Sequence, residues 1–223
     1  MSARAGPIAD TDSITLSQSP LSVGIAGAGS AGLATALALA QAGHQVRVFE
    51  KHPGFTTQGA GLLLQPPGVR ALRSLGVDVA ALNVGAPIDR LLGVSHRGWP
   101  VVDIDYVGDG ARAVTRAALG GVLFDACRRA GVAFSFGCPV QTLDSQAGRA
   151  RVVHGEGANQ AESLFDVFVV ADGAASALRE QVGLASKSRV YRWGALWGQF
   201  WTPDWPGACL LYTSDAADEG LGV

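Results

Sequence analysis

The sequence predicts an α/β fold, and three observations along the chain support this assignment. A short apolar run, a glycine turn, an alanine-rich helical pattern and a second strand follow one another between residues 21 and 50. A later apolar run ends in "ADG" at residues 171–173. The segment from Ile88 to Tyr106 contains "VVDIDYV", whose alternation of apolar and acidic residues is typical of an antiparallel strand with one solvated face.

Composition places the chain among globular proteins and excludes several classes of partner. Of 223 residues, 48% are apolar and 16% are charged, which is enough apolar material for a substantial core. Lys and Arg number 17 against 19 Asp and Glu, so no basic field attracts nucleic acid. Three cysteines occur without a CxxC pair or metal-ligand spacing. We therefore expect a reducing, cytoplasmic compartment, no nucleic-acid partner and no metal site.

Residues 21–43 carry no charge, a length that would suffice for a membrane span. The run holds five glycines in the order of a phosphate-binding turn, which argues against a span. The segment before it has two acids and one arginine, unlike a signal peptide. We expect no membrane span.

Gly27, Gly29 and Gly32 form the pattern G-x-G-x-x-G between the first strand and the helix. The first glycine allows a tight turn, the second lets a pyrophosphate approach the backbone, and the third lets the helix pack on the strand. Glu50 ends the second strand, where a carboxylate accepts hydrogen bonds from ribose hydroxyls and repels a 2′-phosphate. The pattern predicts a dinucleotide other than NADP and leaves NAD and FAD open.

The segment after Glu50 departs from the repeated helix and strand units that an NAD domain would continue. Residues 59–76 predict a loop and then a short helix, entered through Pro66 and Pro67 and closed by Gly76. The strand-like segment from Ile88 to Tyr106 follows.

The second half of the chain predicts one helix and a group of strands. A helix is expected from Ala117 to Ala130, with an apolar stripe along one side. The stripe consists of Leu119, Val122, Leu123, Ala126 and Cys127. Residues 132–136 predict a strand, and residues 140–170 predict a meander that ends in "FDVFVVADGAAS".

Three elements in this order resemble the flavin-dependent aromatic monooxygenases of the p-hydroxybenzoate and salicylate hydroxylase type. They are the glycine turn with Glu50, the segment "AVTRAALGGVL" around Arg116, and "ADGAASALR" at Asp172 and Gly173. The resemblance runs from about Pro20 to about Pro206. It implies FAD, held by a Rossmann-like FAD-binding domain of the glutathione-reductase type, with part of an antiparallel-sheet substrate domain.

The resemblance also assigns residues to the cofactor. The arginine that matches Arg116 lies against the flavin cofactor, whose negative charge offsets a cation at a helix start. Asp172 helps to hold the FAD, and its surrounding segment also serves NAD(P)H. The predicted cofactor-binding residues are Gly27, Gly29, Ser30, Gly32, Glu50, Lys51, Gly59, Gly61, Arg116, Asp172 and Gly173.

The implied reaction uses NAD(P)H to reduce FAD and dioxygen to hydroxylate a small aromatic substrate. No side chain is identified as its acid or base. A same-fold flavoprotein of other chemistry, such as a halogenase or an isoprenoid reductase, is the alternative, although the lysine motif of halogenases is absent after the glycine turn. A non-catalytic nucleotide-binding protein is a third possibility.

The domain boundaries follow from these assignments. Residues 1–20 form a flexible lead-in, residues 21–84 and 113–187 the FAD-binding domain, and residues 85–112 and 188–208 a partial substrate domain. The stretch "CLLYTSDAADE" at residues 209–219 is what a transposon-end sequencing adapter encodes, so we expect a non-native tail over residues 209–223. The family's third signature, a later Gly-Asp pair at the flavin, is expected beyond Ala208.

The remaining candidates are aromatic and histidine residues. Trp193, Trp197 and Trp201 recur at every fourth position and would share one face of a strand, as a packing face or as the lining of an aromatic pocket. The four histidines are expected to have surface or structural roles. They are His44, His52, His96 and His154.

Overall fold

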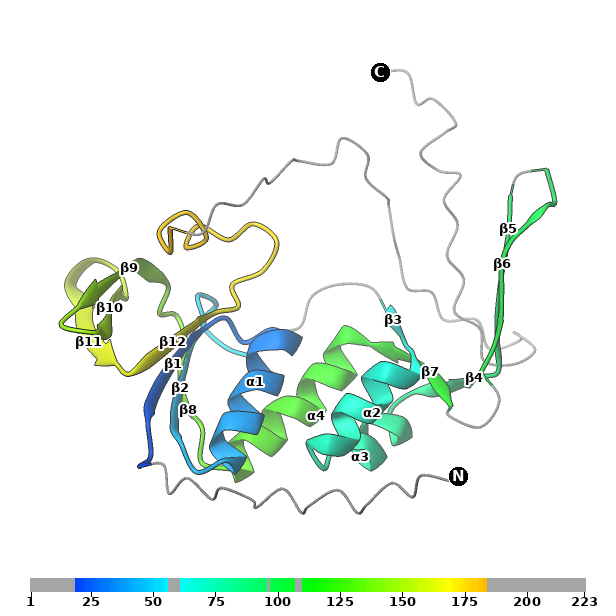
Figure 1. The fold of residues 1–223 in the computed structure, drawn as a ribbon, viewed down its shortest axis with the longest axis horizontal. Helices are drawn as coiled ribbons and strands as arrows, with labels where there is room; N and C mark the ends of the chain where they lie inside the picture. The colour runs from blue at the N-terminus through cyan, green and yellow to red at the C-terminus, as the bar shows by residue number, and fades with distance from the viewer. Residues whose placement is uncertain (1–18, 56–60, 96, 107–109, 184–223) are drawn as a thin grey trace, which may run out of the picture.

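The computed structural model describes residues 19–55, 61–95, 97–106 and 110–183 (Figure 1). Several expectations therefore lie outside the described residues. These concern the lead-in up to residue 18, Gly59, His96, the three tryptophans from 193 to 201 and the tail from residue 209.

A parallel sheet of four strands confirms the predicted α/β fold. Its order is β12-β1-β2-β8, with β1 (Ser22–Ala26) between β12 (Val167–Val170) and β2 (Gln45–Phe49). Every pairing is parallel, and the edge strands are β12 and β8 (Ala133–Ser135). Helix α1 (Ser30–Gln41) connects β1 to β2, as the glycine turn and the alanine-rich pattern predict.

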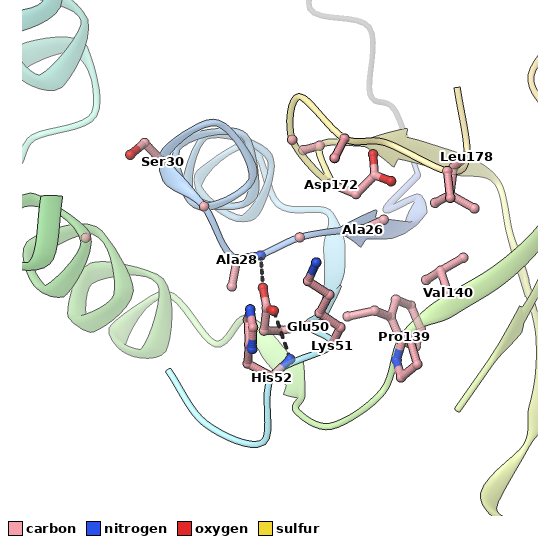
Figure 2. A pocket seen from close by; sticks show the side chains of 18 of the residues that line it. Ala26, Ala28, Ser30, Glu50, Lys51, His52, Pro139, Val140, Asp172 and Leu178 are labelled. Carbon is pink, nitrogen blue, oxygen red and sulfur yellow. Dashed lines mark hydrogen bonds between the residues drawn. The ribbon is translucent and has the colours of Figure 1, made fainter. Parts of the chain in front are cut away.

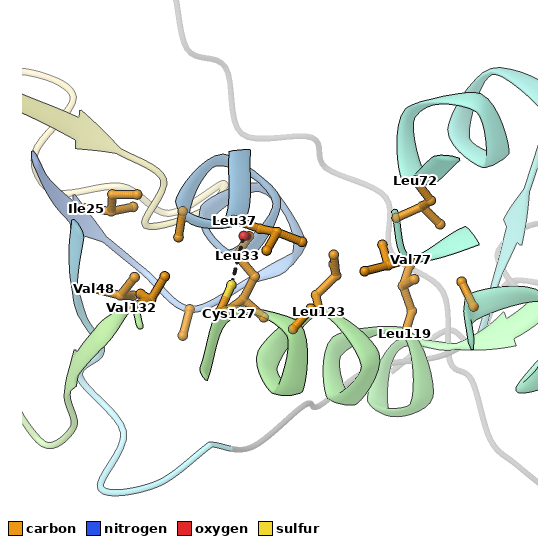
Figure 3. Close-up of a cluster of buried hydrophobic side chains, with 14 of the residues drawn as sticks. Ile25, Leu33, Leu37, Val48, Leu72, Val77, Leu119, Leu123, Cys127 and Val132 are labelled. Atoms are coloured by element: carbon orange, nitrogen blue, oxygen red, sulfur yellow. Dashed lines mark hydrogen bonds between the residues drawn. The ribbon is translucent and has the colours of Figure 1, made fainter. Parts of the chain in front are cut away.

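Helix α4 (Arg116–Arg129) packs against α1 and forms the main core with it (Figure 3). The predicted stripe is confirmed, because its members are buried or pack partly buried against this core. The Cys127 thiol donates a hydrogen bond to the Leu33 carbonyl of α1, at 3.2 Å. None of the helices in the described residues is long and apolar enough to cross a membrane.

The region between β2 and α4 contains more structure than the sequence predicts. Helix α2 (Pro66–Ser74) begins at the two prolines as expected, but α3 (Asp78–Asn83) was not predicted. The expected loop is wrong at β3 (Gly61–Leu64), which pairs antiparallel with β7 (Ala111–Thr115). Strand β4 (Ala86–Ile88) pairs with the other edge of β7. Because these partners lie far apart in the sequence, no local pattern indicates their pairing.

The segment from Ile88 to Tyr106 forms a hairpin of β5 (Arg90–Val94) and β6 (Pro100–Asp105) that extends away from the parallel sheet (Figure 1). The antiparallel prediction is confirmed. The expectation of one solvated face is wrong, because Val101 is 75% exposed and Ile104 on the opposite face is 41% exposed. The described residues therefore bury neither face of β6.

An antiparallel layer covers the sheet on the side opposite α1. Strands β9 (Val140–Gln146), β10 (Arg149–His154) and β11 (Ala161–Phe165) form the predicted meander. The meander ends at β11, however, and β12 joins the parallel sheet instead. A second buried cluster lies between the layers. Its members are Ala26, Phe49, Leu143, Val152, Phe165 and Leu178.

The third glycine of the turn generates a test of the fold. A Cβ atom at Gly32 would overlap the Gly27 carbonyl oxygen, whereas one at Gly121 in α4 would meet nothing within 4 Å. We expect Gly32→Ala to lower the free energy of unfolding by more than about 2 kcal/mol. Gly121→Ala, the control, should raise it by about 0.5–1 kcal/mol through better helix propensity. Urea unfolding measures both, and equal midpoints would contradict the proposed packing.

Candidate functional site

A cavity of about 460 Å³ opens at the carboxyl ends of β1, β2 and β12 (Figure 2). This volume lies in the usual range of ligand pockets, and this edge of an open α/β sheet is where ligands usually bind. The lining residues come from five separate parts of the chain. They are residues 26–30, 49–52, Arg116 and Gly120, and residues 139–140, 171–173, 175, 177 and 178.

Gly27 holds the first part of the turn in a left-handed conformation, with φ of 101°. A Cβ atom there would overlap the Ala171 carbonyl oxygen at the end of β12. The Gly27 N–H donates to the Phe49 carbonyl at 2.8 Å. The turn is thus held between β2 and β12, while Gly32 supports it from behind without lining the cavity.

Gly29 supplies the open side of the turn. It is the N-cap of α1, and no atom lies within 4 Å of the position that its Cβ would take. The first turn of α1 carries no acidic residue and no side-chain cap, and Ser30 lines the cavity beside it. Free N–H groups at a helix start favour an anion, so these residues fit a pyrophosphate.

Glu50 lies directly after β2 and connects two backbone segments. Its Oε2 atom accepts a hydrogen bond from the Ala28 N–H at 2.9 Å, and Oε1 accepts one from the His52 N–H at 3.0 Å (Figure 2). A carboxylate oxygen can accept more than one hydrogen bond, so a ribose hydroxyl can still bind here. The sequence predicted the acid but not its bond to the glycine turn.

Arg116 is the first residue of α4 and lines the cavity. No carboxylate of the described residues forms an ion pair with it. Its positive charge also stands at a helix N-terminus, which is an unfavourable place for a cation. An anionic ligand in the cavity would pair with this charge and would offset its unfavourable interaction with the helix N-terminus.

Asp172 supplies a second indication of a ligand. Its Oδ1 atom is buried and has no hydrogen-bond partner among the described residues. An unpaired buried polar atom costs about 1–3 kcal/mol. The next residue, Gly173, has φ of 93° and no atom within 4 Å of its Cβ position, so the backbone is open to the cavity there.

The structure brings most of the predicted cofactor residues together, with three exceptions, of which Gly32 lies behind the turn and does not line the cavity. Gly61 pairs with Thr115 in the β3–β7 ladder and does not line the cavity. Gly59 lies outside the described residues. Those that line the cavity are Gly27, Gly29, Ser30, Glu50, Lys51, Arg116, Asp172 and Gly173.

Other lining residues were missed by the sequence reasoning. His52, expected to have a surface or structural role, lines the cavity, and its position next to the ribose acid was the available signal. Pro139, Val140 and Leu178 form an apolar side (Figure 2). They carry no local signal, because Pro139 and Val140 follow β8, which pairs with β2, and Leu178 reaches the cavity by packing in the second buried cluster.

The surroundings of Cys127, Cys138 and His154 favour structural roles for these side chains. Burial raises the pKa of the Cys127 thiol to about 11 and also raises the pKa of the Cys138 thiol. Cys138 Sγ lies 3.3 Å from Nδ1 of His154, whose Nε2 lies 2.9 Å from the Ser163 hydroxyl. Burial lowers the pKa of His154. In the part of the chain that the structure describes, no three His, Cys, Asp or Glu residues form a metal site.

Comparisons with known proteins agree with this geometry. Residues 20–217 match the FAD binding domain family. The 3-hydroxybenzoate 6-hydroxylase 1 of Aquipseudomonas alcaligenes is 34% identical over 116 residues, which are 48% of this chain and 29% of that protein. The salicylate hydroxylase of Pseudomonas putida is 34% identical over 173 residues, which are 73% of this chain and 38% of that protein.

A solved structure extends the likeness to the fold. The tetrameric form of 2-methyl-3-hydroxypyridine-5-carboxylic acid oxygenase is similar with a TM-score of 0.65 and 28% sequence identity. The match covers 75% of this chain and 43% of that one. The chain therefore spans less than half the length of each of these three proteins.

The unpaired Asp172 oxygen generates a stability test. Asp172→Ala removes no hydrogen bond among the described residues, so we expect an unchanged or higher urea midpoint in the absence of ligand. Asp166→Ala is the matched control, because that carboxylate accepts from the Ser22 N–H at 2.8 Å and pairs with Arg149 at 3.1 Å. Its midpoint should fall.

The control also has a pH signature. The Ser22 N–H is the main cause that lowers the pKa of Asp166, so its contribution is present above the unfolded pKa and is lost as the pH falls through the lowered pKa. The destabilisation by Asp166→Ala should therefore shrink in acid. A larger loss for Asp172→Ala than for Asp166→Ala at neutral pH would contradict the assignment of Asp172 as unpaired.

Proposed function

We propose, because the chain belongs to the FAD binding domain family, that it is part of a monooxygenase that hydroxylates an aromatic substrate with FAD, NAD(P)H and dioxygen. The observation that carries this proposal is the convergence of five distant segments on one cavity, which has an open anion site, a ribose acid, an unpaired arginine and an unpaired carboxylate oxygen. Both relatives are named as hydroxylases, which favours an oxygenase over a flavoprotein of other chemistry.

The residues of the cavity would hold FAD by complementary charge and hydrogen bonding. The open N–H groups at Gly29 and the start of α1 suit the pyrophosphate. Glu50 suits the adenosine ribose, and Arg116 supplies a positive charge opposite the phosphates. Asp172 offers an acceptor to a hydroxyl of the cofactor.

When bound, FAD would supply the electron transfer from NAD(P)H and the activation of dioxygen. The described residues bind and orient it, and the apolar side at Pro139, Val140 and Leu178 keeps water from one side of the cavity. The proposed substrate class is a small hydroxylated aromatic acid. Support comes from the names of the relatives, which act on 3-hydroxybenzoate and on salicylate. We further propose that the protein is located in the cytoplasm and that its small-molecule partners are dioxygen and the aromatic substrate.

The activity is tested on the protein that contains this chain. Purified protein with FAD should oxidise NADH or NADPH and consume dioxygen when hydroxylated aromatic acids are added one at a time. Mass spectrometry should find one oxygen atom added to the accepted substrate, and isotopically labelled dioxygen should label that product. NAD(P)H oxidation without any hydroxylated product across the panel would contradict the proposal.

Glu50 generates a separate prediction for cofactor binding. Glu50→Ala removes one or two charge-assisted hydrogen bonds to the ribose, each contributing about 1.5–3 kcal/mol. We expect the FAD dissociation constant to rise by roughly tenfold to 150-fold for each bond. Titration of FAD fluorescence measures the constant.

The control for Glu50 separates charge from position. Glu156→Ala changes an exposed acid outside the cavity and should leave the FAD constant unchanged. Glu50→Gln keeps one acceptor for the Ala28 N–H and should lie between Glu50→Ala and the unchanged protein. An FAD constant that is unaffected by Glu50→Ala would remove Glu50 from the site.

A further inference from the structure

The segment from Asp172 to Gln181 forms one wall of the cavity and is weakly anchored by apolar contacts. Ala175, Ala177 and Leu178 line the cavity, but Leu178 is the one buried residue in the range 173–183. Leu178 belongs to the second buried cluster together with Leu143 of β9. A single buried side chain holds this segment against the protein, but it leaves the path of the segment's backbone weakly constrained because apolar contacts are not directional.

Strand β9 offers a free edge close to this segment. The described meander has the order β11-β10-β9, so one side of β9 carries unpaired backbone groups. Figure 1 shows the segment after β12, coloured yellow to orange, running next to β9. Leu178 and Val140, the first residue of β9, lie on the same side of the cavity in Figure 2.

Gln181 binds this edge with both ends of its side-chain amide. Its Oε1 accepts from the Leu143 N–H at 2.9 Å, and its Nε2 donates to the Gln141 carbonyl at 3.0 Å. These two backbone groups flank Thr142, and a residue of a neighbouring parallel strand would engage such a pair in the same way. The glutamine side chain therefore replaces a strand at this point.

The anchored end is connected to the cavity by a series of short hydrogen-bonded turns. The Gln181 N–H donates to the Leu178 carbonyl at 3.0 Å, and the Ser176 N–H donates to the Gly173 carbonyl at 3.2 Å. Between them, the Arg179 N–H donates to the Ser176 hydroxyl at 3.1 Å. These bonds connect Gln181, step by step, to Gly173 at the cavity.

We propose that Gln181 is a positioning residue that clamps the wall from Asp172 to Leu178 onto the edge of β9 and so sets the affinity of the cavity for FAD. This inference rests on the proposed function in one respect, because it takes FAD as the ligand. The clamp itself is a property of the protein without ligand.

The experiment compares two glutamines that bind the same residue of β9. Gln181→Leu removes both bonds of the clamp. Gln160→Leu is the matched control, because Gln160 donates to the side chain of Gln141 at 2.8 Å but belongs to a segment outside the cavity. Hydrogen–deuterium exchange without FAD, and FAD titration of the same samples, are measured for each variant in the protein that contains this chain.

We expect Gln181→Leu to speed exchange at the Leu143 amide and across residues 173–181, and to raise the FAD dissociation constant by roughly tenfold. Gln160→Leu should change neither. Gln181→Glu keeps the acceptor for the Leu143 N–H and loses the donor, so its exchange rates should lie between those of Gln181→Leu and the unchanged chain.

Two results would overturn the proposal. Unchanged exchange at Leu143 and residues 173–181 in Gln181→Leu would refute the clamp, and faster exchange with an unchanged FAD constant would refute its role in binding. Failure of the protein that contains this chain to bind FAD would refute the proposed ligand, while the exchange data, taken without FAD, would still decide whether the clamp exists.

Discussion

The close approach of Gly27 to the end of β12 is the constraint on which the rest of the site depends. A side chain at this position would overlap the Ala171 carbonyl oxygen, and the left-handed backbone there also disfavours one. The contact joins the turn after β1 to the first residues after β12, which are about 145 positions apart in the sequence. Asp172 consequently faces the same cavity as Glu50.

Hydrogen bonds from Glu50 make the turn and the neighbouring loop one unit. The carboxylate accepts from Ala28 in the turn and from His52 in the loop after β2. The residue that the sequence assigns to the ligand therefore also organises the backbone around it. In contrast, the charge of Arg116 and the Oδ1 atom of Asp172 have no partner among the described residues. Such uncompensated groups are typical of a site whose complement is a ligand.

The sequence predicted the elements that depend on interactions between nearby residues better than those that depend on contacts between distant residues. The unit from β1 through α1 to β2 and the helix α4 were predicted because turn glycines and apolar periodicity act within a few residues. Strand β3 and the departure of β12 from the meander were not predicted. Each of these depends on which distant strand is available as a partner, and residue propensity does not contain that information.

The chemistry available to the site could be predicted from residue types at fixed spacings, namely the glycine pattern, Glu50, Arg116 and Asp172. Which of these residues meet depends on the packed fold, which leaves Gly32 and Gly61 outside the cavity and adds His52, Pro139, Val140 and Leu178. It also decided that Gln181 attaches the cavity wall to β9. The physical reason is that a cavity wall and a strand edge are made by segments that become neighbours only when the two layers pack.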